Sequence, residues 1–138
     1  MIKVFIDGAS SGNPGKAGIG YLIYKEESLI KKGSFYLGIT TNNFAEYMAL
    51  IFSLVEVLNL KEENCCVYSD SKLLCEQING NYKVKNKNLY PLYILSRHLI
   101  SFFKQFKINY ISRKENKEAD KLAKEVIKMR GWENEWSF

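Results

Sequence analysis

The sequence predicts an α/β protein with a five-stranded mixed sheet, whose first three strands are antiparallel, and helices on both faces of the sheet. Three observations lead to this prediction. Ile2, Val4 and Ile6 alternate with Lys3 and Phe5, which is the two-residue period of a strand. Two further β-prone segments follow at short spacing. Apolar residues then recur at helical spacing in segments that alternate with short β-prone runs, so the expected order of elements is βββαβααβα.

The first forty residues are predicted to form an antiparallel meander of three strands. The first strand leads into a dense turn signal at Ser10-Ser-Gly-Asn-Pro-Gly15. Residues 19–24 and 34–39 are β-prone, and residues 25–28 join them as a hairpin.

A helix is predicted next, followed by a strand and a short second helix. Thr41-Asn-Asn43 offers helix N-cap chemistry. The residues that would face the core at helical spacing are Phe44, Tyr47, Met48, Ile51, Phe52, Val55 and Leu58. Residues 65–69 are expected to form the fourth strand, and residues 71–78 a short helix that ends at Gly80.

The last third of the chain is predicted to contain two helices around a fifth strand. A polar stretch at 79–88 precedes a helix over 92–106, and Pro91 suits its first turn. Residues 107–111 form the fifth strand. The last helix has an apolar face of Ala119, Leu122, Ala123, Val126 and Ile127. We assign one domain to residues 1–131 and leave 132–138 as a C-terminal tail of unknown role.

Composition and charge narrow the class of protein. The chain has 138 residues, a formal charge of +5 and 46% hydrophobic residues, values of one folded domain with a modest attraction to polyanions. Three cysteines, without a CxxC spacing, exclude a disulfide framework and a zinc box, so buried free thiols are expected. The N-terminus lacks signal-peptide character and no apolar run approaches ~20 residues. We therefore expect a soluble, cytoplasmic protein with no membrane association.

Four acidic residues occupy positions that this architecture would bring together. Asp7 lies in the first strand and Asp70 ends the fourth, where ligands bind in sheets of this kind. Glu46 lies in the first turn of the first long helix, and Asp120 lies early in the last helix. Each acid alone also fits a structural role, as a turn residue, a helix cap or a first-turn acid.

Four converging carboxylates would repel one another unless a divalent cation were bound. Hard oxygen ligands suit Mg²⁺ or Mn²⁺. Two such ions roughly 4 Å apart can activate a water molecule and stabilise a leaving alkoxide in phosphodiester cleavage. The four acids therefore indicate metal-dependent chemistry on a nucleic acid.

The chain resembles the ribonuclease H type 1 family over nearly its whole length. The matching segments are Asp7-Gly-Ala-Ser-Ser-Gly-Asn-Pro-Gly15, Thr41-Asn-Asn-Phe-Ala-Glu46, Tyr68-Ser-Asp-Ser71, Val84-Lys-Asn86 and Asn116-Lys-Glu-Ala-Asp120. The resemblance implies a ribonuclease H-like fold. It also implies an endonuclease that cuts the RNA strand of an RNA–DNA hybrid and leaves 5′-phosphate and 3′-hydroxyl ends.

The resemblance also assigns roles to individual residues. Asp7, Glu46, Asp70 and Asp120 would hold two Mg²⁺ or Mn²⁺ ions once substrate is bound, with Asp7 bridging both. Asn13 would contact the RNA strand, and Asn42 and Asn43 would reach into the minor groove. Thr41 and Asn86 would hold a phosphate of the DNA strand. Short amide and hydroxyl side chains suit a surface that distinguishes hybrids by groove shape and 2′-hydroxyl groups. No obligatory protein partner is implied.

The chain departs from the family pattern in two places. The loop at 111–116, where many members carry a histidine, has Arg113 but no histidine, and the single His98 lies within the predicted third helix as a surface or packing residue. The basic protrusion of some relatives is also missing between the second helix and Val84. Arg113 would contact a phosphate or form a structural ion pair. Lys72 would touch the nucleic-acid backbone or lie free on the surface.

Two alternatives remain open at this stage, and a third is not favoured. One is a related nuclease that acts on double-stranded RNA or RNA–DNA junctions. Another is a non-catalytic nucleic-acid-binding module of the same fold. The third is a ribonuclease H domain attached to a polymerase, for which 138 residues leave no room.

Overall fold

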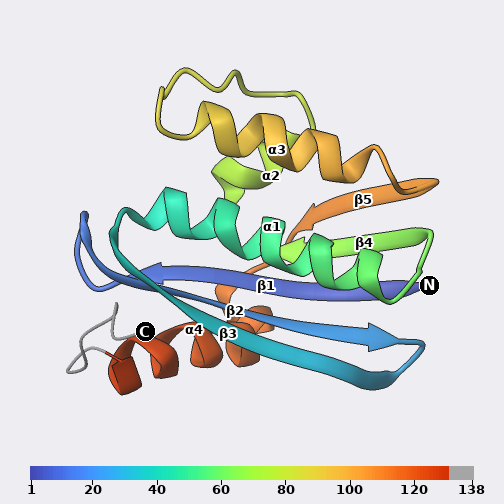
Figure 1. Ribbon diagram of the computed structural model, residues 1–138, viewed down its shortest axis with the longest axis horizontal. Coiled ribbons are helices and arrows are strands. Elements are labelled where there is room, and N and C mark those ends of the chain that lie inside the picture. Colours follow the sequence, from blue (N-terminus) through green and yellow to red (C-terminus); the bar gives the residue numbers. More distant parts are fainter. Residues whose placement is uncertain (131–138) are drawn as a thin grey trace.

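The computed structural model describes residues 1–130, so the predicted tail 132–138 lies outside the described residues. The elements follow the predicted order (Figure 1). They are β1 (Ile2–Ser10), β2 (Gly15–Lys25), β3 (Ser28–Thr40), α1 (Asn42–Asn59), β4 (Asn64–Ser69), α2 (Lys72–Ile78), α3 (Tyr90–Ile100), β5 (Gln105–Tyr110), the short 3-10 helix η1 (Arg113–Asn116) and α4 (Lys117–Arg130).

The five strands form one mixed sheet in the order β3-β2-β1-β4-β5. β1, β2 and β3 are antiparallel neighbours, as the sequence predicts, whereas β4 runs parallel to β1 and β5 parallel to β4. The register pairs Ile6 with Ser69 at the end of the β1–β4 ladder. Because β1 and β4 run in the same direction, the residues that follow this pair, Asp7 and Asp70, lie at the same end of the sheet.

Helices cover both faces of the sheet, which confirms the predicted layers (Figure 1). α1 contacts β1 and β2 on one face and packs against α3. α4 lies against β1, β2 and β3 on the other face. A Cβ on Gly20 would lie 2.6 Å from the carbonyl oxygen of Ala119, so glycine at this position of β2 lets α4 approach closely.

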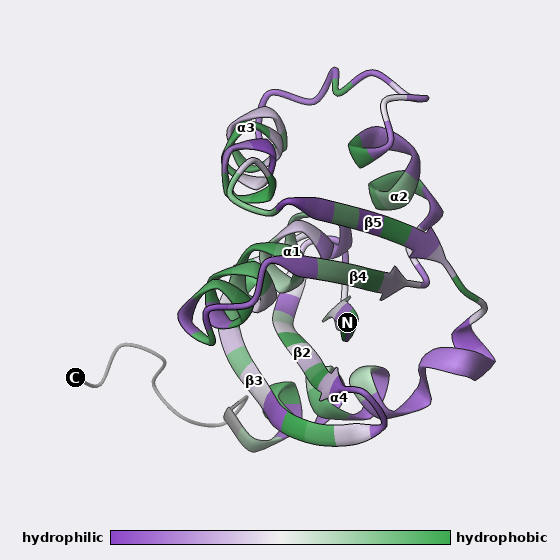
Figure 2. Ribbon diagram, turned by 90° about the vertical axis from the view of Figure 1, so that its right-hand side faces the viewer, coloured by the Kyte–Doolittle hydropathy of each residue, from purple (hydrophilic) through white to green (hydrophobic). Residues whose placement is uncertain are grey.

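The main core lies between the sheet and α1. Ile2, Val4 and Ile6 of β1 are fully buried there, together with Leu50 and Leu54 of α1. Burial of each such side chain stabilises the fold by roughly 1.5–3 kcal/mol. β4 carries a hydrophobic stretch between hydrophilic ends (Figure 2), as expected for a parallel strand inside a sheet. The core thus fixes the strand ends that carry the acidic residues.

The third helix is shorter than its sequence predicts. α3 ends at Ile100 rather than at residue 106, and β5 begins at Gln105 rather than at 107. Phe103 turns into the core, and the backbone amide of Lys104 donates a hydrogen bond to the carbonyl of Glu63 over 2.9 Å. Tertiary packing against the start of β4 therefore overrides the helical spacing of the apolar residues in this segment. His98 is exposed and meets Phe102 edge-on, which confirms its predicted surface role.

All three cysteines are buried free thiols, as predicted. Burial raises the pKa of Cys65 to about 12 and that of Cys75 to about 11. The thiol of Cys75 lies 3.9 Å from the carbonyl oxygen of Ser69, directly behind the end of β4. Among residues 1–130, no helix has the length and apolar character needed to cross a membrane.

Candidate active site

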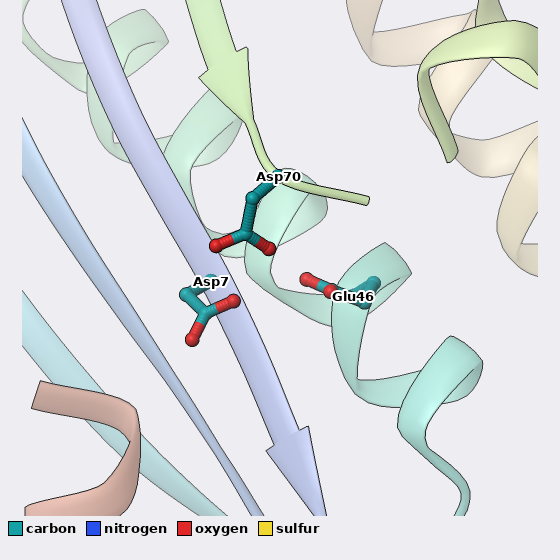
Figure 3. Close-up of side chains that lie close together, drawn as sticks. All are labelled: Asp7, Glu46 and Asp70. Atoms are coloured by element: carbon teal, nitrogen blue, oxygen red, sulfur yellow. The ribbon is translucent and has the colours of Figure 1, made fainter. Parts of the chain in front are cut away.

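Three carboxylates from distant parts of the chain meet at one end of the sheet (Figure 3). Asp7 comes from β1, Glu46 from the first turns of α1, and Asp70 follows directly after β4. One oxygen of each lies within 4.8 Å of the others. Asp7 and Glu46 are each only 4% exposed. Buried carboxylates this close to one another are the kind of donor set that holds a divalent cation.

The turn after β4 directs Asp70 towards the other two acids. The hydroxyl of Ser69 is buried and accepts a hydrogen bond from the backbone amide of Ser71 over 3.0 Å. The hydroxyl of Ser71 then caps α2 by accepting from the amide of Leu74 over 3.2 Å. These two hydroxyl groups, from the residues on either side of Asp70, satisfy backbone donors of the turn and of α2, so the turn that carries its carboxylate is fixed locally.

The carboxylate of Glu46 is hydrogen-bonded directly to the backbone of β1. Its Oε1 accepts a hydrogen bond from the backbone amide of Gly8 over 2.8 Å. A Cβ on Gly8 would lie 2.3 Å from the carbonyl carbon of Ala45 and 2.4 Å from the backbone nitrogen of Glu46. Only glycine therefore lets α1 come near enough to β1 for this bond to form.

The electrostatics of the cluster disfavour charge in the absence of a cation. Burial, together with the charges of Glu46, Asp70 and Asp120, raises the pKa of Asp7 to about 10. Burial also raises the pKa of Glu46 to about 8, although the amide of Gly8 and the charge of Arg113 act in the opposite direction. A bound cation would reverse this effect because it stabilises the deprotonated carboxylates.

Asp120 faces Asp7 from α4, next to the three-carboxylate cluster. A hydrogen bond between the two side chains contributes to the raised pKa of Asp7. Its Oδ2 also forms an ion pair with Lys124 over 3.0 Å, one helical turn further along. The structure thus brings all four predicted acids to one region, with three in the tight cluster and Asp120 at its edge.

Asn116 connects two of the strands at this site. It is 2% exposed, and its Nδ2 donates to the backbone carbonyl of Ile6 over 2.8 Å and to Oδ2 of Asp70 over 3.2 Å. Asn116 ends η1, and α4 starts at the next residue. One side chain therefore ties β1, the turn after β4 and the start of α4 together.

The predicted substrate-contacting residues near the start of α1 lie beside the loop between β1 and β2. The side-chain oxygen of Asn13 accepts a hydrogen bond from the backbone amide of Asn42 over 3.1 Å. Thr41 caps α1 by accepting from the amide of Phe44 over 3.3 Å, as the sequence predicts. Asn13, Thr41, Asn42 and Asn43 are all exposed and form one polar surface.

The remaining predicted contacts lie in η1, at the start of α2 and in the segment before α3. Arg113 is exposed in η1, and its charge reaches Glu46. Lys72 is exposed at the first position of α2, two residues after Asp70. The side-chain oxygen of Asn86 accepts from the amides of Asn88 and Leu89 over 2.7 and 3.2 Å. Asn86 thus orders the chain before α3.

Known proteins share this sequence and architecture. A family described as reverse transcriptase-like matches residues 5–126. A ribonuclease H of Haemophilus influenzae is 35% identical, in an alignment that covers 90% of this chain and 88% of that protein. This chain belongs to the ribonuclease H family. The crystal structure of LC11-RNase H1 in complex with an RNA/DNA hybrid matches with a TM-score of 0.89 and 34% identity, over 94% of this chain and 98% of that one.

Some ribonuclease H relatives are longer than this chain. A bifunctional protein of Mycobacterium tuberculosis is 36% identical over 130 residues, which cover 91% of this chain. The matched region spans only 36% of that protein, so the chain corresponds to about a third of its length.

Two side chains at the site were not assigned roles from the sequence. Asn116 was noted only as part of a motif, because nothing local indicates that its partners lie in β1 and after β4. Lys124 belongs to a lysine stripe that the sequence predicts to be a solvated helix face, yet its ammonium group reaches Asp120. The spacing of four residues between Asp120 and Lys124 was the available signal, since such pairs face each other on a helix.

Proposed function

We propose that this protein hydrolyses the RNA strand of RNA–DNA hybrids at the carboxylate cluster. The observation that carries the proposal is the meeting of buried Asp7 and Glu46 with half-buried Asp70, with oxygens within 4.8 Å of one another and Asp120 beside them. In this reaction water adds to phosphorus and the bond from phosphorus to the 3′ oxygen breaks. That oxygen takes up a proton, which gives 5′-phosphate and 3′-hydroxyl ends.

The donor set fits divalent cations. Carboxylate oxygens are the ligands that Mg²⁺ and Mn²⁺ prefer. Burial, together with the neighbouring carboxylates, raises the pKa values of Asp7 and Glu46, and a bound cation would offset both effects. We assign Asp7, Glu46, Asp70 and Asp120 as the holders of two ions in the substrate complex. Bound there, the ions would supply charge neutralisation, a more acidic water and stabilisation of the leaving oxygen.

The polar surface beside the cluster supports a hybrid as substrate. Asn42 and Asn43 are exposed in the first turn of α1, the helix that carries Glu46, and Asn13 and the N-cap Thr41 adjoin them. Such groups suit the 2′-hydroxyls and groove edges by which a hybrid differs from double-stranded DNA. LC11-RNase H1, which has the same fold, forms a complex with an RNA/DNA hybrid.

Arg113 lies where a loop histidine is found in many family members. Its charge reaches Glu46, and its guanidinium group suits a phosphate. We propose that Arg113 and Lys72 bind phosphates on either side of the cluster. We also propose a cytoplasmic location and no obligatory protein partner.

The test compares cleavage of four labelled substrates in Mg²⁺ or Mn²⁺: an RNA–DNA hybrid, double-stranded RNA, an RNA–DNA junction and single-stranded RNA. Wild-type protein is compared with Asp7→Asn and with Glu118→Gln, which makes the same chemical change at an exposed position of α4. Cleavage of the hybrid is expected, with a loss of more than about 100-fold in Asp7→Asn and wild-type rates in Glu118→Gln. Preferred cleavage of double-stranded RNA or junctions would instead identify a related nuclease. Binding of the hybrid without cleavage would identify a non-catalytic module.

A further inference from the structure

Asn116 occupies the place where the β1–β4 ladder ends. The last pair of that ladder is Ile6 with Ser69, after which the chain leaves β4 and turns at Asp70. The carbonyl of Ile6 therefore lies at the open end of the ladder, and the Nδ2 of Asn116 donates to it over 2.8 Å. A buried carbonyl without a donor costs about 1–3 kcal/mol, so this bond holds Asn116 firmly against β1.

The second hydrogen of the same amide reaches the cluster. The Nδ2 of Asn116 also donates to Oδ2 of Asp70 over 3.2 Å. An amide nitrogen has two hydrogens at a fixed angle, so the direction of the bond to Ile6 determines the direction of the bond to Asp70. The carboxylate of Asp70 is thereby oriented relative to the strand that carries Asp7.

The position of Asn116 in the chain extends this effect to α4. Asn116 is the last residue of η1, and Asp120 lies four residues later in α4. A side chain fixed to β1 at Asn116 therefore sets where the first turn of α4 stands over the sheet, and with it the position of Asp120 beside Asp7. The oxygen Oδ1 of Asn116 is buried and has no partner among the described residues. The side chain of Asn116 therefore donates two hydrogen bonds, to Ile6 and to Asp70, while its own oxygen stays unpaired within residues 1–130.

We infer that Asn116 is a positioning residue, which fixes Asp70 and Asp120 relative to Asp7 and so sets the affinity of the site for divalent cations. This inference rests on the proposed function, because it concerns the metal site used there. It predicts a specific pattern: a change at Asn116 weakens metal binding and kcat, whereas KM for the hybrid is preserved, since Asn116 is buried and is not part of the exposed polar surface around Asn42.

The matched control is Gln77, another buried amide that joins separate elements. Gln77 is 4% exposed, accepts from the hydroxyl of Tyr47 over 2.6 Å and donates to the carbonyl of Lys83 over 3.4 Å. Its partners are Tyr47 of α1 and the segment after α2, and none of the four carboxylates is among them. Gln77→Ala should therefore lower thermal stability as Asn116→Ala does, without changing the affinity for metal.

The experiment measures Mn²⁺ or Mg²⁺ binding by calorimetry, and hybrid cleavage across a metal titration, for wild type, Asn116→Ala and Gln77→Ala. Asn116→Ala is expected to lower metal affinity and kcat by about 10- to 100-fold while KM for the hybrid changes less than about twofold. Equal metal affinity and kcat in Asn116→Ala and wild type would overturn the inference. Absence of metal binding and cleavage in the wild type would instead refute the proposed function.

A second measurement needs no variant and covers the case in which Asn116→Ala fails to fold. In a ¹⁵N-labelled wild-type protein, the side-chain amide resonances of Asn116 should shift as Mg²⁺ is added, because one of its hydrogens is bonded to Asp70. The amide resonances of Gln77 should stay in place. Unchanged Asn116 resonances at saturating Mg²⁺ would contradict the inference.

Discussion

The side-chain oxygen of Asn13 accepts a hydrogen bond from the backbone amide of Asn42 over 3.1 Å, across 29 residues of sequence. This bond holds the loop between β1 and β2 against the start of α1. Both segments belong to the polar surface that we propose as the contact for the hybrid. The surface is therefore ordered before the substrate arrives, which reduces the entropy that binding would otherwise cost.

Asn13→Ala is expected to weaken binding of the hybrid while leaving the chemical step intact. The variant loses one hydrogen bond, worth about 1 kcal/mol, and the side-chain amide that would contact the hybrid. We expect KM to rise by about 3- to 10-fold with little change in kcat, measured by steady-state cleavage. Asn64→Ala, an exposed residue at the opposite end of β4, is the control and should leave both constants unchanged. A fall in kcat at constant KM would refute this role for the loop.

Asp7→Asn is expected to stabilise the metal-free protein at high pH. Asp7 has an ordinary pKa near 3.8 when unfolded and about 10 in the fold, so the folded state holds the extra proton between these values. The stability gained in this way is complete below about pH 4 and is lost as pH rises towards 10. Asparagine has no proton to lose. The free energy of unfolding of wild type, measured in urea with EDTA, should therefore fall relative to Asp7→Asn as pH rises.

Added Mg²⁺ should remove this difference. The deprotonated carboxylates of wild type bind the cation, and ligands that bind only the folded state stabilise it. The gain in stability should increase with pH in wild type and be much smaller in Asp7→Asn. Equal gains in both proteins at every pH would show that Asp7 does not contribute to the metal site.

Gly8→Ala is expected to damage fold and site together. The new Cβ would lie within 2.4 Å of backbone atoms of Ala45 and Glu46, which cannot move without shifting α1. We expect a loss of about 3 kcal/mol or more in the free energy of unfolding, together with reduced metal affinity. At Gly12, the nearest atom to an added Cβ is 3.0 Å away and the next are at 3.7 Å. Gly12→Ala should therefore cost much less in urea unfolding; equal losses in the two variants would contradict the explanation.

Lys124→Gln is expected to strengthen metal binding. The ammonium group pairs with Asp120 over 3.0 Å, so it competes with a divalent cation for that carboxylate. An exposed pair of this type is worth about 0.5 kcal/mol, which predicts a two- to threefold lower Mg²⁺ concentration at half-maximal activity. Lys121→Gln makes the same change in charge on α4, next to Glu125 instead, and should have a smaller effect. Weaker metal binding in Lys124→Gln would show that the lysine orients Asp120.

The order of elements could be predicted because strand and helix periodicities are local. Alternation at Ile2, Val4 and Ile6 marked β1, and the cap at Thr41 marked the start of α1. The end of α3 could not be predicted, since the segment after Ile100 keeps helix-compatible apolar residues. Its conformation depends on the bond between Lys104 and Glu63, a contact with the start of β4 that no local pattern encodes.

The same limit applies to the candidate site. Asp7 and Asp70 could be expected to meet because each lies near the end of a strand and parallel strands end together. The bond from Gly8 to Glu46 and the two bonds of Asn116 join residues 38 to 110 positions apart. Such contacts depend on the packing of α1 and η1 against the sheet, so residue types alone could not assign them.

The rate at which the buried thiols are alkylated can report local opening of the fold. A thiolate is the reactive form of cysteine, and burial holds the pKa of Cys65 and Cys75 well above neutrality. A thiol reagent can therefore modify these residues only when the surrounding elements separate. Cys75 lies against the carbonyl of Ser69, so its rate of alkylation measures how often the turn that carries Asp70 comes apart. Slower alkylation of Cys75 in the presence of Mg²⁺ would show that metal binding makes local opening of this turn less frequent.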